Sequence, residues 1–260
     1  MASESQGTLA GKNVLIMGVA NRWSIAYAIG EAMKAQGATL ILSYLDERMK
    51  KDCEALLADQ PNGKMYPCDV SKDEDIDALA ETIKSDFGRL DTYIHSVGFA
   101  PGDAMKNSFI ETTRDGWRIA LDVSAYSLVA VSARIAPLMT DGGSIQTLTY
   151  LGSERVFPAY KVMGVAKAAL EASVRYLAWD LGEQGIRVNA ISAGPIKTAA
   201  ARGIPGFMDM YKHLNEKTPL KSDFTAEKVS GLSVFLASNA SAAITGEVIF
   251  ADNGYHAMGM

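Results

Sequence analysis

Short apolar segments alternate with helical segments along most of the chain, and this alternation limits the possible folds more than any other feature. Each apolar segment is rich in branched aliphatic residues, and the stretch that follows it has helical periodicity. The predicted strands cover residues 12–17, 38–44, 64–67, 90–95, 144–148, 187–191 and 247–250. The predicted helices cover residues 23–36, 46–58, 73–87, 114–139, 160–181 and 226–237.

This order of elements favours a parallel sheet. Strands that are buried on both faces read as nearly continuous apolar runs, and parallel strands need long crossovers, which the helices supply. We therefore predict an α/β fold with a single doubly wound Rossmann domain, in which a seven-stranded parallel sheet has helices on both faces. Because no proline-rich linker, charge block or internal repeat divides the chain, we expect residues 1–260 to form one domain, with residues 1–7 as a disordered N-terminus.

One stretch departs from the regular alternation. Residues 193–218 are interrupted by three glycines and two prolines, and the sequence predicts irregular structure there. A long segment of this kind in an otherwise regular domain usually covers a binding site. We expect a substrate lid near residues 196–217.

The composition excludes several classes of protein. The 25 Lys and Arg residues are outnumbered by 30 Asp and Glu residues, which gives a formal net charge of −5. The chain therefore lacks the basic surface that binding to nucleic acid requires, and we expect no nucleic-acid partner. An apolar content of 48% is sufficient for a full hydrophobic core, which excludes a disordered or fibrous chain.

Cysteine and histidine usage gives no sign of a disulfide framework or a metal site. The only two cysteines, Cys53 and Cys68, are too few for a disulfide framework. The cysteines and the three histidines also lack the spacing that is typical of metal ligands. The N-terminus does not resemble a signal peptide, and uninterrupted apolar runs are shorter than the roughly 20 residues that cross a bilayer. We expect a cytoplasmic protein with no membrane association and no metal.

The first strand leads into residues 18–26 and then into a helix. In doubly wound folds the pyrophosphate of a dinucleotide binds here, at the N-terminus of the helix. The spacing differs from the usual Gly-x-Gly-x-x-Gly, and Gly18 alone is equally typical of a simple turn. Ser24 is expected to cap the helix, to donate its hydroxyl to phosphate, or to do both.

Two later strand ends carry further candidates. Asp69 follows the third strand, where its carboxylate either binds the adenine of a dinucleotide or caps the next helix, and the residues alone leave both alternatives open. Residues 95–102 follow the fourth strand, and their glycines Gly98 and Gly102 allow a ligand to approach the backbone closely. Because the strands are parallel, we expect these residues at the same sheet edge as Gly18.

The strongest local signal lies after the fifth strand. Tyr160 and Lys167 are seven residues apart, close to two helical turns, so they share one face of a helix. A tyrosine hydroxyl can donate to a developing oxyanion, and a nearby lysine can hold ribose hydroxyls. Such a pair is usually plain helix surface, but its position in a nucleotide-binding sheet favours a catalytic site.

These motifs resemble the short-chain dehydrogenase/reductase superfamily and, within it, the bacterial enoyl-[acyl-carrier-protein] reductases. Gly18 followed by Ser24-Ile25-Ala26, and the Tyr-x6-Lys pair, are similar to that branch, whereas other members have Thr-Gly-x-x-x-Gly-x-Gly and Tyr-x-x-x-Lys. The resemblance extends over residues 8–256. It implies reduction of the trans-2 double bond of an enoyl thioester by hydride transfer from NADH, in the last reductive step of the fatty acid elongation cycle.

The resemblance also implies roles for individual residues. Tyr150, Tyr160 and Lys167 match catalytic positions, with Tyr160 at the thioester oxygen and Lys167 at the nicotinamide ribose. Besides Lys167, the residues that match cofactor contacts are Gly18, Ser24, Ile25, Leu45, Asp69, Val70, Val97, Ile196 and Thr198. The expected substrate contacts are Ala100, Tyr150, Tyr160, Met163, Phe207 and Met210. In the lid, Phe207 and Met210 are expected to close over the acyl chain, although apolar residues at this spacing are more often plain core.

The choice of cofactor depends on the residues after the second strand. Apolar Leu45 occupies the position of a polar ribose contact, and the acidic Asp46 and Glu47 repel a 2′-phosphate. Arg48 and the lysines after it attract one. We expect NADH and leave NADPH open.

The resemblance implies an acyl carrier protein as the partner that delivers the substrate. This partner is acidic and should dock on basic residues near the lid. Residues 203–211 contain no Lys or Arg, so Lys197, Arg202 and Lys212 are the candidates. The superfamily further implies a homotetramer assembled through the helices at 114–139 and 160–181.

Two alternative functions remain open. A ketoacyl or other carbonyl reductase of the superfamily usually has its lysine four residues after the tyrosine and a serine about thirteen before it. Thr147 occupies the earlier position, whereas the lysine spacing and Tyr150 weigh against this function. A non-enzymatic dinucleotide sensor shares the fold but has no need of both Tyr160 and Lys167.

Overall fold

The computed structural model describes residues 7–198 and 206–259, except for the side chains of Phe207 and Met210. Its strands are β1 (Asn13–Met17), β2 (Thr39–Tyr44), β3 (Lys64–Pro67), β4 (Thr92–His95), β5 (Gly143–Thr149), β6 (Ile186–Ala193) and β7 (Val248–Ala251). Its α-helices are α1 (Ile25–Ala35), α2 (Glu47–Leu57), α3 (Asp73–Phe87), α4 (Gly102–Lys106), α5 (Arg114–Leu121), α6 (Ser127–Ile135), α7 (Lys161–Gly182), α9 (Phe207–Lys217) and α10 (Ala226–Ala237). Short turns of other helix types are η1 (Phe109–Glu111), η2 (Asp122–Tyr126), η3 (Ala136–Leu138), η4 (Leu151–Ser153), η5 (Asn239–Ser241) and η6 (Tyr255–Ala257).

All seven of these strands form one parallel sheet in the order β3-β2-β1-β4-β5-β6-β7. The chain steps outward from β1 to β3, returns to β4 beside β1 and continues outward to β7. At this reversal Ile16 pairs with Ile94 and Met17 pairs with His95. The predicted doubly wound, seven-stranded parallel sheet is confirmed, and its switch point, where such folds bind ligands, lies between β1 and β4.

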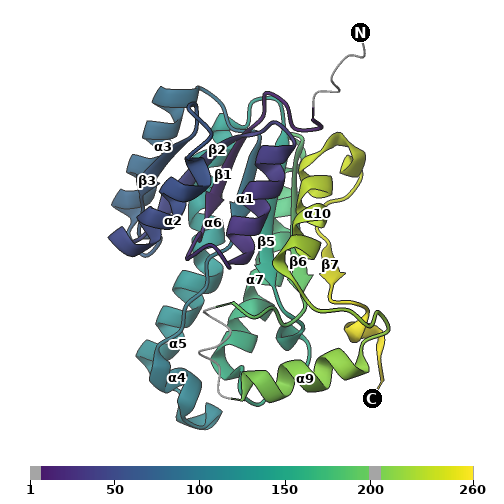
Figure 1. Cartoon of the computed structure of the whole chain (residues 1–260). Helices are drawn as coiled ribbons and strands as arrows, with labels where there is room; N and C mark the ends of the chain where they lie inside the picture. The colour runs from purple at the N-terminus through teal and green to yellow at the C-terminus, as the bar shows by residue number, and fades with distance from the viewer. Residues whose placement is uncertain (1–6, 199–205, 260) are drawn as a thin grey trace.

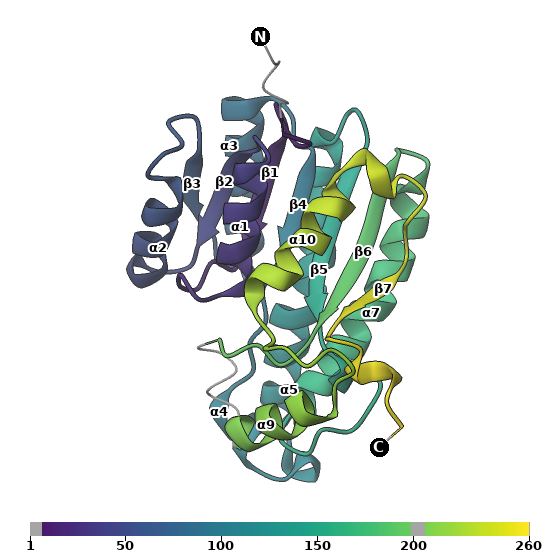
Figure 2. The ribbon, with the colours of Figure 1, turned by 45° about the vertical axis from the view of Figure 1, so that its right-hand side comes forward.

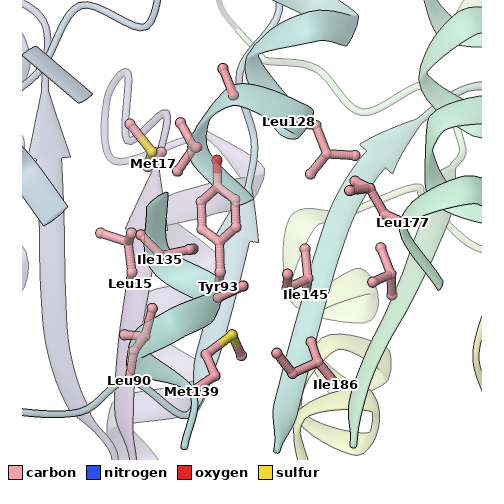
Figure 3. Close-up of a cluster of buried hydrophobic side chains, with 14 of the residues drawn as sticks. Leu15, Met17, Leu90, Tyr93, Leu128, Ile135, Met139, Ile145, Leu177 and Ile186 are labelled. Carbon is pink, nitrogen blue, oxygen red and sulfur yellow. The ribbon is translucent and has the colours of Figure 1, made fainter. Parts of the chain in front are cut away.

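Helices cover both faces of the sheet (Figures 1 and 2). On one face α1, α2 and α10 pack against the strands, and on the other face α3, α6 and α7 do so. Successive residues of a strand point to opposite faces, so Leu15 and Met17 belong to one buried layer and Val14 and Ile16 to the other. Figure 3 shows the first layer, in which Tyr93 of β4 lies among aliphatic side chains.

The segment predicted as one long helix at 114–139 is helical without a break from Arg114 to Leu138, but its helix type changes. The helix α5 ends at Leu121, a turn of π-helix covers Asp122–Tyr126, and α6 ends at Ile135. Such turns insert one residue into a helix and often accompany functional sites.

The same segment, Arg114–Leu138, is long and apolar enough to cross a membrane when judged by length and composition alone. Uninterrupted apolar runs in the sequence give no sign of this segment. However, 56% of its most apolar window is buried inside the protein, and Leu128, Val131 and Ile135 are fully buried in the core. Packing against the sheet therefore explains its apolar character.

The stretch predicted as irregular contains a helix. Gly206 has a φ of 72°, and α9 begins directly after it, with Tyr211 and Leu214 buried on one side. The prediction of irregular structure over 193–218 is thus wrong for α9, because the preceding glycines and prolines masked its helical periodicity. Residues 199–205 and 1–6 lie outside the described residues, so disorder of the N-terminus stays a prediction.

Candidate active site

The candidate residues lie at the carboxyl edge of the sheet, the edge that faces α4, α5 and α9 in Figure 1. Gly18 follows β1, Val97 and Ala100 follow β4, and Tyr150 follows β5. The parallel topology brings the ends of these adjacent strands together. Leu45, Asp69 and Val70 follow β2 and β3 and therefore lie further out along the same edge.

The loop after β1 packs directly against the loop after β4. Gly18 has a φ of 95°, and a Cβ atom at this position would collide with the carbonyl oxygen of Ser96. Both conditions require glycine. A structural role in the turn is therefore sufficient to explain glycine at position 18. The contact between Gly18 and Ser96 lies at the switch point, where doubly wound folds bind dinucleotides.

Ser24 is the N-cap of α1. Its Oγ accepts a hydrogen bond from the backbone N–H of Tyr27 at 3.2 Å and donates one to the carbonyl oxygen of Asn21 at 2.7 Å. The predicted capping role is confirmed. A hydroxyl has one proton, and Ser24 already donates it to Asn21. A phosphate at this position would therefore accept hydrogen bonds mainly from the free backbone N–H groups of the first helical turn, which begins at Ile25.

Asp69 stabilises a turn. Its Oδ1 accepts hydrogen bonds from the backbone N–H and the hydroxyl of Ser71, at 3.0 and 2.7 Å. The next helix, α3, begins at Asp73 after Lys72 as its N-cap. The sequence alternative in which Asp69 caps that helix is therefore wrong, since its carboxylate acts one turn earlier.

Lys167 is the buried cation of the site. Only 7% of it is exposed, and its Nζ donates to the carbonyl oxygen of Leu148 at 2.7 Å. Burial lowers the pKa of Lys167 to about 8, against the opposing field of Glu171. A Cβ atom on Gly98 would lie 3.6 Å from Nζ, so the ammonium lies against the loop after β4.

The residue that follows Leu148 holds a buried acid. Thr149 donates its hydroxyl to Oε1 of Glu171 at 2.5 Å, and both residues are almost fully buried. Glu171 lies four residues after Lys167 on α7, so the two side chains share the helix face that covers the end of β5.

Tyr150 and Tyr160 form an aromatic pair. Their ring centroids are 5.0 Å apart with an interplanar angle of 73°, and the ring of Phe157 also packs against Tyr150, with centroids 4.9 Å apart. Burial raises the pKa of the Tyr160 hydroxyl well above its usual value, and the field of Glu171 adds to this. Burial likewise raises the pKa of Tyr150. Both phenols are therefore protonated at neutral pH.

The Tyr160 hydroxyl is available as a donor. Tyr160 is half-buried at the N-cap of α7, one residue before the helix proper. Within the described part of the chain, no protein group hydrogen-bonds this hydroxyl. A protonated phenol with a free donor is suited to bind an oxygen atom that gains negative charge.

Lys161 connects the start of α7 to α4. It has a φ of 44°, a strained value for a residue with a side chain, and its Nζ donates to the carbonyl oxygens of Met105, Lys106 and Asn107 at 2.9, 2.8 and 2.6 Å. The next residue, Val162, is fully buried in a small apolar cluster that includes residues of α4 and α5. The loop after β4 and the Tyr160 segment are therefore held together.

The π turn holds the same loop from another side. The hydroxyl of Ser124 donates to the carbonyl oxygen of Phe99 at 3.0 Å and accepts from its backbone N–H at 2.9 Å. The sulfur of Met163 lies 3.7 Å from the same hydroxyl. These contacts position Ala100 beside the first turn of α7.

A cavity of about 250 Å³ opens beside the N-terminus of α1. It is lined by Ser24 from α1, by Ile196 and Lys197 from the segment after β6, and by residues between Tyr211 and Glu227. Ser24 and Ile196 are thus brought together, and Thr198 follows, with its backbone N–H bonded to the Ile196 carbonyl at 2.7 Å. The side chains of Phe207 and Met210 lie outside the described residues.

Several side chains of this site were not singled out from the sequence. Glu171 carries a signal, because its i+4 spacing puts it on the face of Lys167, and Thr149 precedes Tyr150 directly. Lys161 and Ser124 carry none, since their contacts join segments far apart in the sequence. No group of three or more metal-ligating side chains occurs in the described part of the chain.

Known proteins match this chain over nearly its whole length. The sequence model of a family described as enoyl-(acyl carrier protein) reductase matches residues 18–256. An enoyl-[acyl-carrier-protein] reductase [NADH] FabI of Bacillus cereus is 47% identical over 254 residues, which are 96% of this chain and 99% of the relative.

Solved structures agree with this match. The enoyl-[acyl-carrier-protein] reductase (NADH) of Aquifex aeolicus superposes with a TM-score of 0.94 at 45% identity, over 98% of this chain and 100% of that one. The Bacillus cereus enoyl-acyl carrier protein reductase, solved with NADP+ and an indole naphthyridinone, gives a TM-score of 0.95 at 46% identity with the same coverage. The chain described here therefore belongs to the enoyl-(acyl carrier protein) reductase family.

Proposed function

We propose that this protein is an enoyl-[acyl-carrier-protein] reductase, which reduces the trans-2 double bond of an enoyl thioester with NADH in the last reductive step of fatty acid elongation. The observation that carries this proposal is the protonated, unengaged hydroxyl of Tyr160 at the N-cap of α7, the helix that carries the buried Lys167. Membership of the family supports the same reaction.

The fit of a dinucleotide rests on the glycines of the sheet edge. A side chain at Gly18 would collide with the Ser96 carbonyl oxygen, and one at Gly98 would contact the Lys167 ammonium. Without these side chains the loops after β1 and β4 meet at the switch point, next to the N-terminus of α1 and the cavity that opens beside it. At this edge we assign the dinucleotide to Gly18, Ser24, Ile25, Leu45, Asp69, Val70, Val97, Lys167, Ile196 and Thr198. When bound, the reduced nicotinamide supplies the hydride that adds to the β-carbon.

Tyr160 and Lys167 have separate roles in the reaction. Addition at the β-carbon moves negative charge onto the thioester oxygen, and Tyr160 donates a hydrogen bond to that oxygen, an interaction worth about 3 kcal/mol in comparable sites. The Lys167 ammonium binds the ribose hydroxyls. Tyr150 lies edge-on to Tyr160 and limits the position of the acyl chain. We also assign Ala100 and Met163 to the substrate, together with Phe207 and Met210, whose side chains lie outside the described residues.

NADH is favoured over NADPH by the residues after β2. Leu45 is 57% exposed and offers no polar contact. Asp46 caps α2 by accepting a hydrogen bond from the backbone N–H of Met49 at 2.8 Å, which fixes a negative charge directly after Leu45, and this charge would repel a 2′-phosphate. Arg48 pairs with Asp46 at 3.8 Å, and Lys50 pairs with Glu47 at 3.4 Å, which reduces their attraction for phosphate. NADPH stays open, since the Bacillus cereus relative was solved with NADP+.

The acyl carrier protein is the partner that delivers the substrate. Lys197 and Lys212 belong to the lid segment, and the Lys197 ammonium lies 4.1 Å from the centre of the Tyr211 ring, which also lines the cavity. Arg202, the third candidate, lies outside the described residues. Replacing Lys212 by Glu should raise the KM for a carrier-protein thioester and leave that for a coenzyme A thioester unchanged.

The assembly is a homotetramer of single-domain subunits in the cytoplasm. Tyr176 and Trp179 of α7 are 75% and 83% exposed, although both are large and aromatic, and Tyr126 of the adjoining π turn is also exposed. A contact between copies would cover this face. Cys53 and Cys68 are free and buried, as in a reducing compartment. Light scattering of the purified protein tests the subunit number.

A carbonyl reductase is the second candidate, because Thr147 occupies the position of the superfamily serine. Thr147 is fully buried on β5. Its hydroxyl lies within hydrogen-bond distance of two atoms of His95, the carbonyl oxygen at 3.2 Å and Nδ1 at 2.8 Å. A hydroxyl engaged in this way does not reach a substrate beside Tyr160. The carbonyl alternative is therefore the weaker one.

The test is oxidation of NADH, and of NADPH in parallel, by purified protein with a trans-2-enoyl thioester. A 3-oxoacyl thioester is the control substrate. Turnover of the enoyl substrate with NADH supports the proposal, and turnover of the oxo substrate alone contradicts it. Absence of turnover with both, even on a carrier-protein thioester, leaves the dinucleotide sensor, for which NADH binding is then measured directly.

A further inference from the structure

Glu171 is a buried acidic side chain to which the reaction above gives no role. It is 6% exposed, and a carboxylate in such a position is unfavourable unless a cation or hydrogen-bond donors compensate it. Thr149 supplies one donor at 2.5 Å. The compensating cation on the same helix face is Lys167, one turn away.

Lys167 and Glu171 are both anchored on consecutive residues of β5. Lys167 bonds the carbonyl oxygen of Leu148, and Glu171 accepts the hydroxyl of Thr149. The strand therefore fixes the spacing of the two charges as well as their burial. Packing alone does not require this arrangement, because two apolar side chains would fill the same space without desolvation.

We propose that Glu171, fixed by Thr149, is a positioning residue that keeps the Lys167 ammonium charged in its buried site, so that it can bind the cofactor ribose. This inference rests on the proposed function only for the identity of the ligand. Among the described residues, Glu171 is the only group whose negative charge acts on Lys167. His95 from β4 is neutral, because burial and the charge of Lys167 lower its pKa to about 3, and the Tyr160 phenol is protonated. Asp122 of the adjoining π turn is half-exposed, and water screens it.

The opposing effects on Lys167 support the proposal. Burial lowers its pKa to about 8, and Glu171 is the group that raises it. Without the carboxylate, the lysine would lose its proton at a lower pH and would be largely neutral at the pH of a cell. The neutral amine lacks the charge-assisted hydrogen bonds that bind ribose hydroxyls strongly.

The experiment compares the pH dependence of NADH affinity in the ligand-free protein, measured by fluorescence between pH 6 and pH 9.5. The affinity of the parent protein should fall as the pH rises through about 8. In Glu171→Gln, which keeps the size and the Thr149 contact, this fall should shift down by about one pH unit. The variant should then bind about five-fold more weakly at pH 8 and equally well at pH 6.

Matched variants separate this role from general damage. Glu183→Gln removes an exposed acid at the end of the same helix and should leave the profile unchanged. Glu171→Asp keeps the negative charge on a shorter side chain, so its profile should lie between those of the parent and Glu171→Gln. Thr149→Val, which leaves the acid but frees it, should give a smaller shift in the same direction and serves as the test if Glu171→Gln does not fold.

A direct readout does not depend on any cofactor. The Cε resonance of Lys167 in protein labelled with 13C-lysine, assigned by Lys167→Met, reports protonation of the amine. Identical titration of Lys167 in the parent and Glu171→Gln would overturn the inference, as would an equal shift in Glu183→Gln. If the parent fails to reduce an enoyl thioester but the titration shifts as expected, the proposed function fails and this inference stands.

Discussion

The two sides of the candidate site are built differently. On the side of β5 and α7, each important side chain has a short contact with a neighbouring element, as in the bond of Lys167 to Leu148 and the pairing of Tyr160 with Tyr150. On the side of α9, the helix is anchored through Tyr211 and Leu214, which pack on Phe224 and its neighbours, while Met208 is 55% exposed. The catalytic side is therefore fixed by the core, whereas the described part of α9 is buried along one side and exposed along the other.

The largest expected effect is on the catalytic side. Tyr160→Phe removes one hydroxyl and leaves the ring contact with Tyr150. We expect kcat to fall by about 100- to 1000-fold, since a single oxyanion donor contributes this much. The affinity for NADH should stay within about two-fold of the parent. An active Tyr160→Phe would show that the oxygen is bound by another group, and Tyr150→Phe would then be the next variant to assay.

The second effect is on stability. Gly18→Ala introduces a Cβ atom that collides with the Ser96 carbonyl at a φ of 95°. We expect the free energy of unfolding to fall by about 2–4 kcal/mol, with loss of NADH binding. Gly88→Ala is the matched control for the cost of a side chain at positive φ, because Gly88 also has a positive φ but has nothing within 4 Å of the added atom. Equal losses in urea unfolding for the two variants would mean that the contact with Ser96 is unimportant.

The same contrast explains what the sequence could predict. The parallel sheet and the placement of Tyr160 and Lys167 at the start of one helix follow from periodicity and spacing, because each depends on residues close together in the sequence. The contact between Gly18 and Ser96 and the three bonds of Lys161 join segments far apart in the sequence, and no local pattern encodes them. The helix α9 was missed for a local reason, since the glycines and prolines before Gly206 obscured two buried positions, Tyr211 and Leu214.

A third prediction concerns the link between the substrate loop and α7. Lys161→Met removes an ammonium that bonds three carbonyl oxygens and keeps a side chain of similar length. We expect a loss of about 1–2 kcal/mol in the free energy of unfolding and a rise of several-fold in the KM for the enoyl thioester. Lys106→Met is the control, because Lys106 lies at the end of α4, beside the carbonyl oxygens that Lys161 binds, and its side chain is exposed. If the two variants unfold at the same denaturant concentration, the three bonds contribute nothing to stability.

The smallest effect is expected on the lid side, where single contacts matter less. Phe207→Ala shortens one apolar side chain of α9, and we expect the KM for a long enoyl thioester to rise about three-fold with little change in kcat or in unfolding. A short enoyl thioester is the internal control, because a chain that does not reach the lid should be reduced by the variant as efficiently as by the parent. If the long substrate is also unaffected, Phe207 does not cover the acyl chain. A rise in KM well above three-fold, with a fall in kcat, would instead mean that the lid positions the substrate as firmly as the catalytic side does, and the contrast between the two sides would be lost.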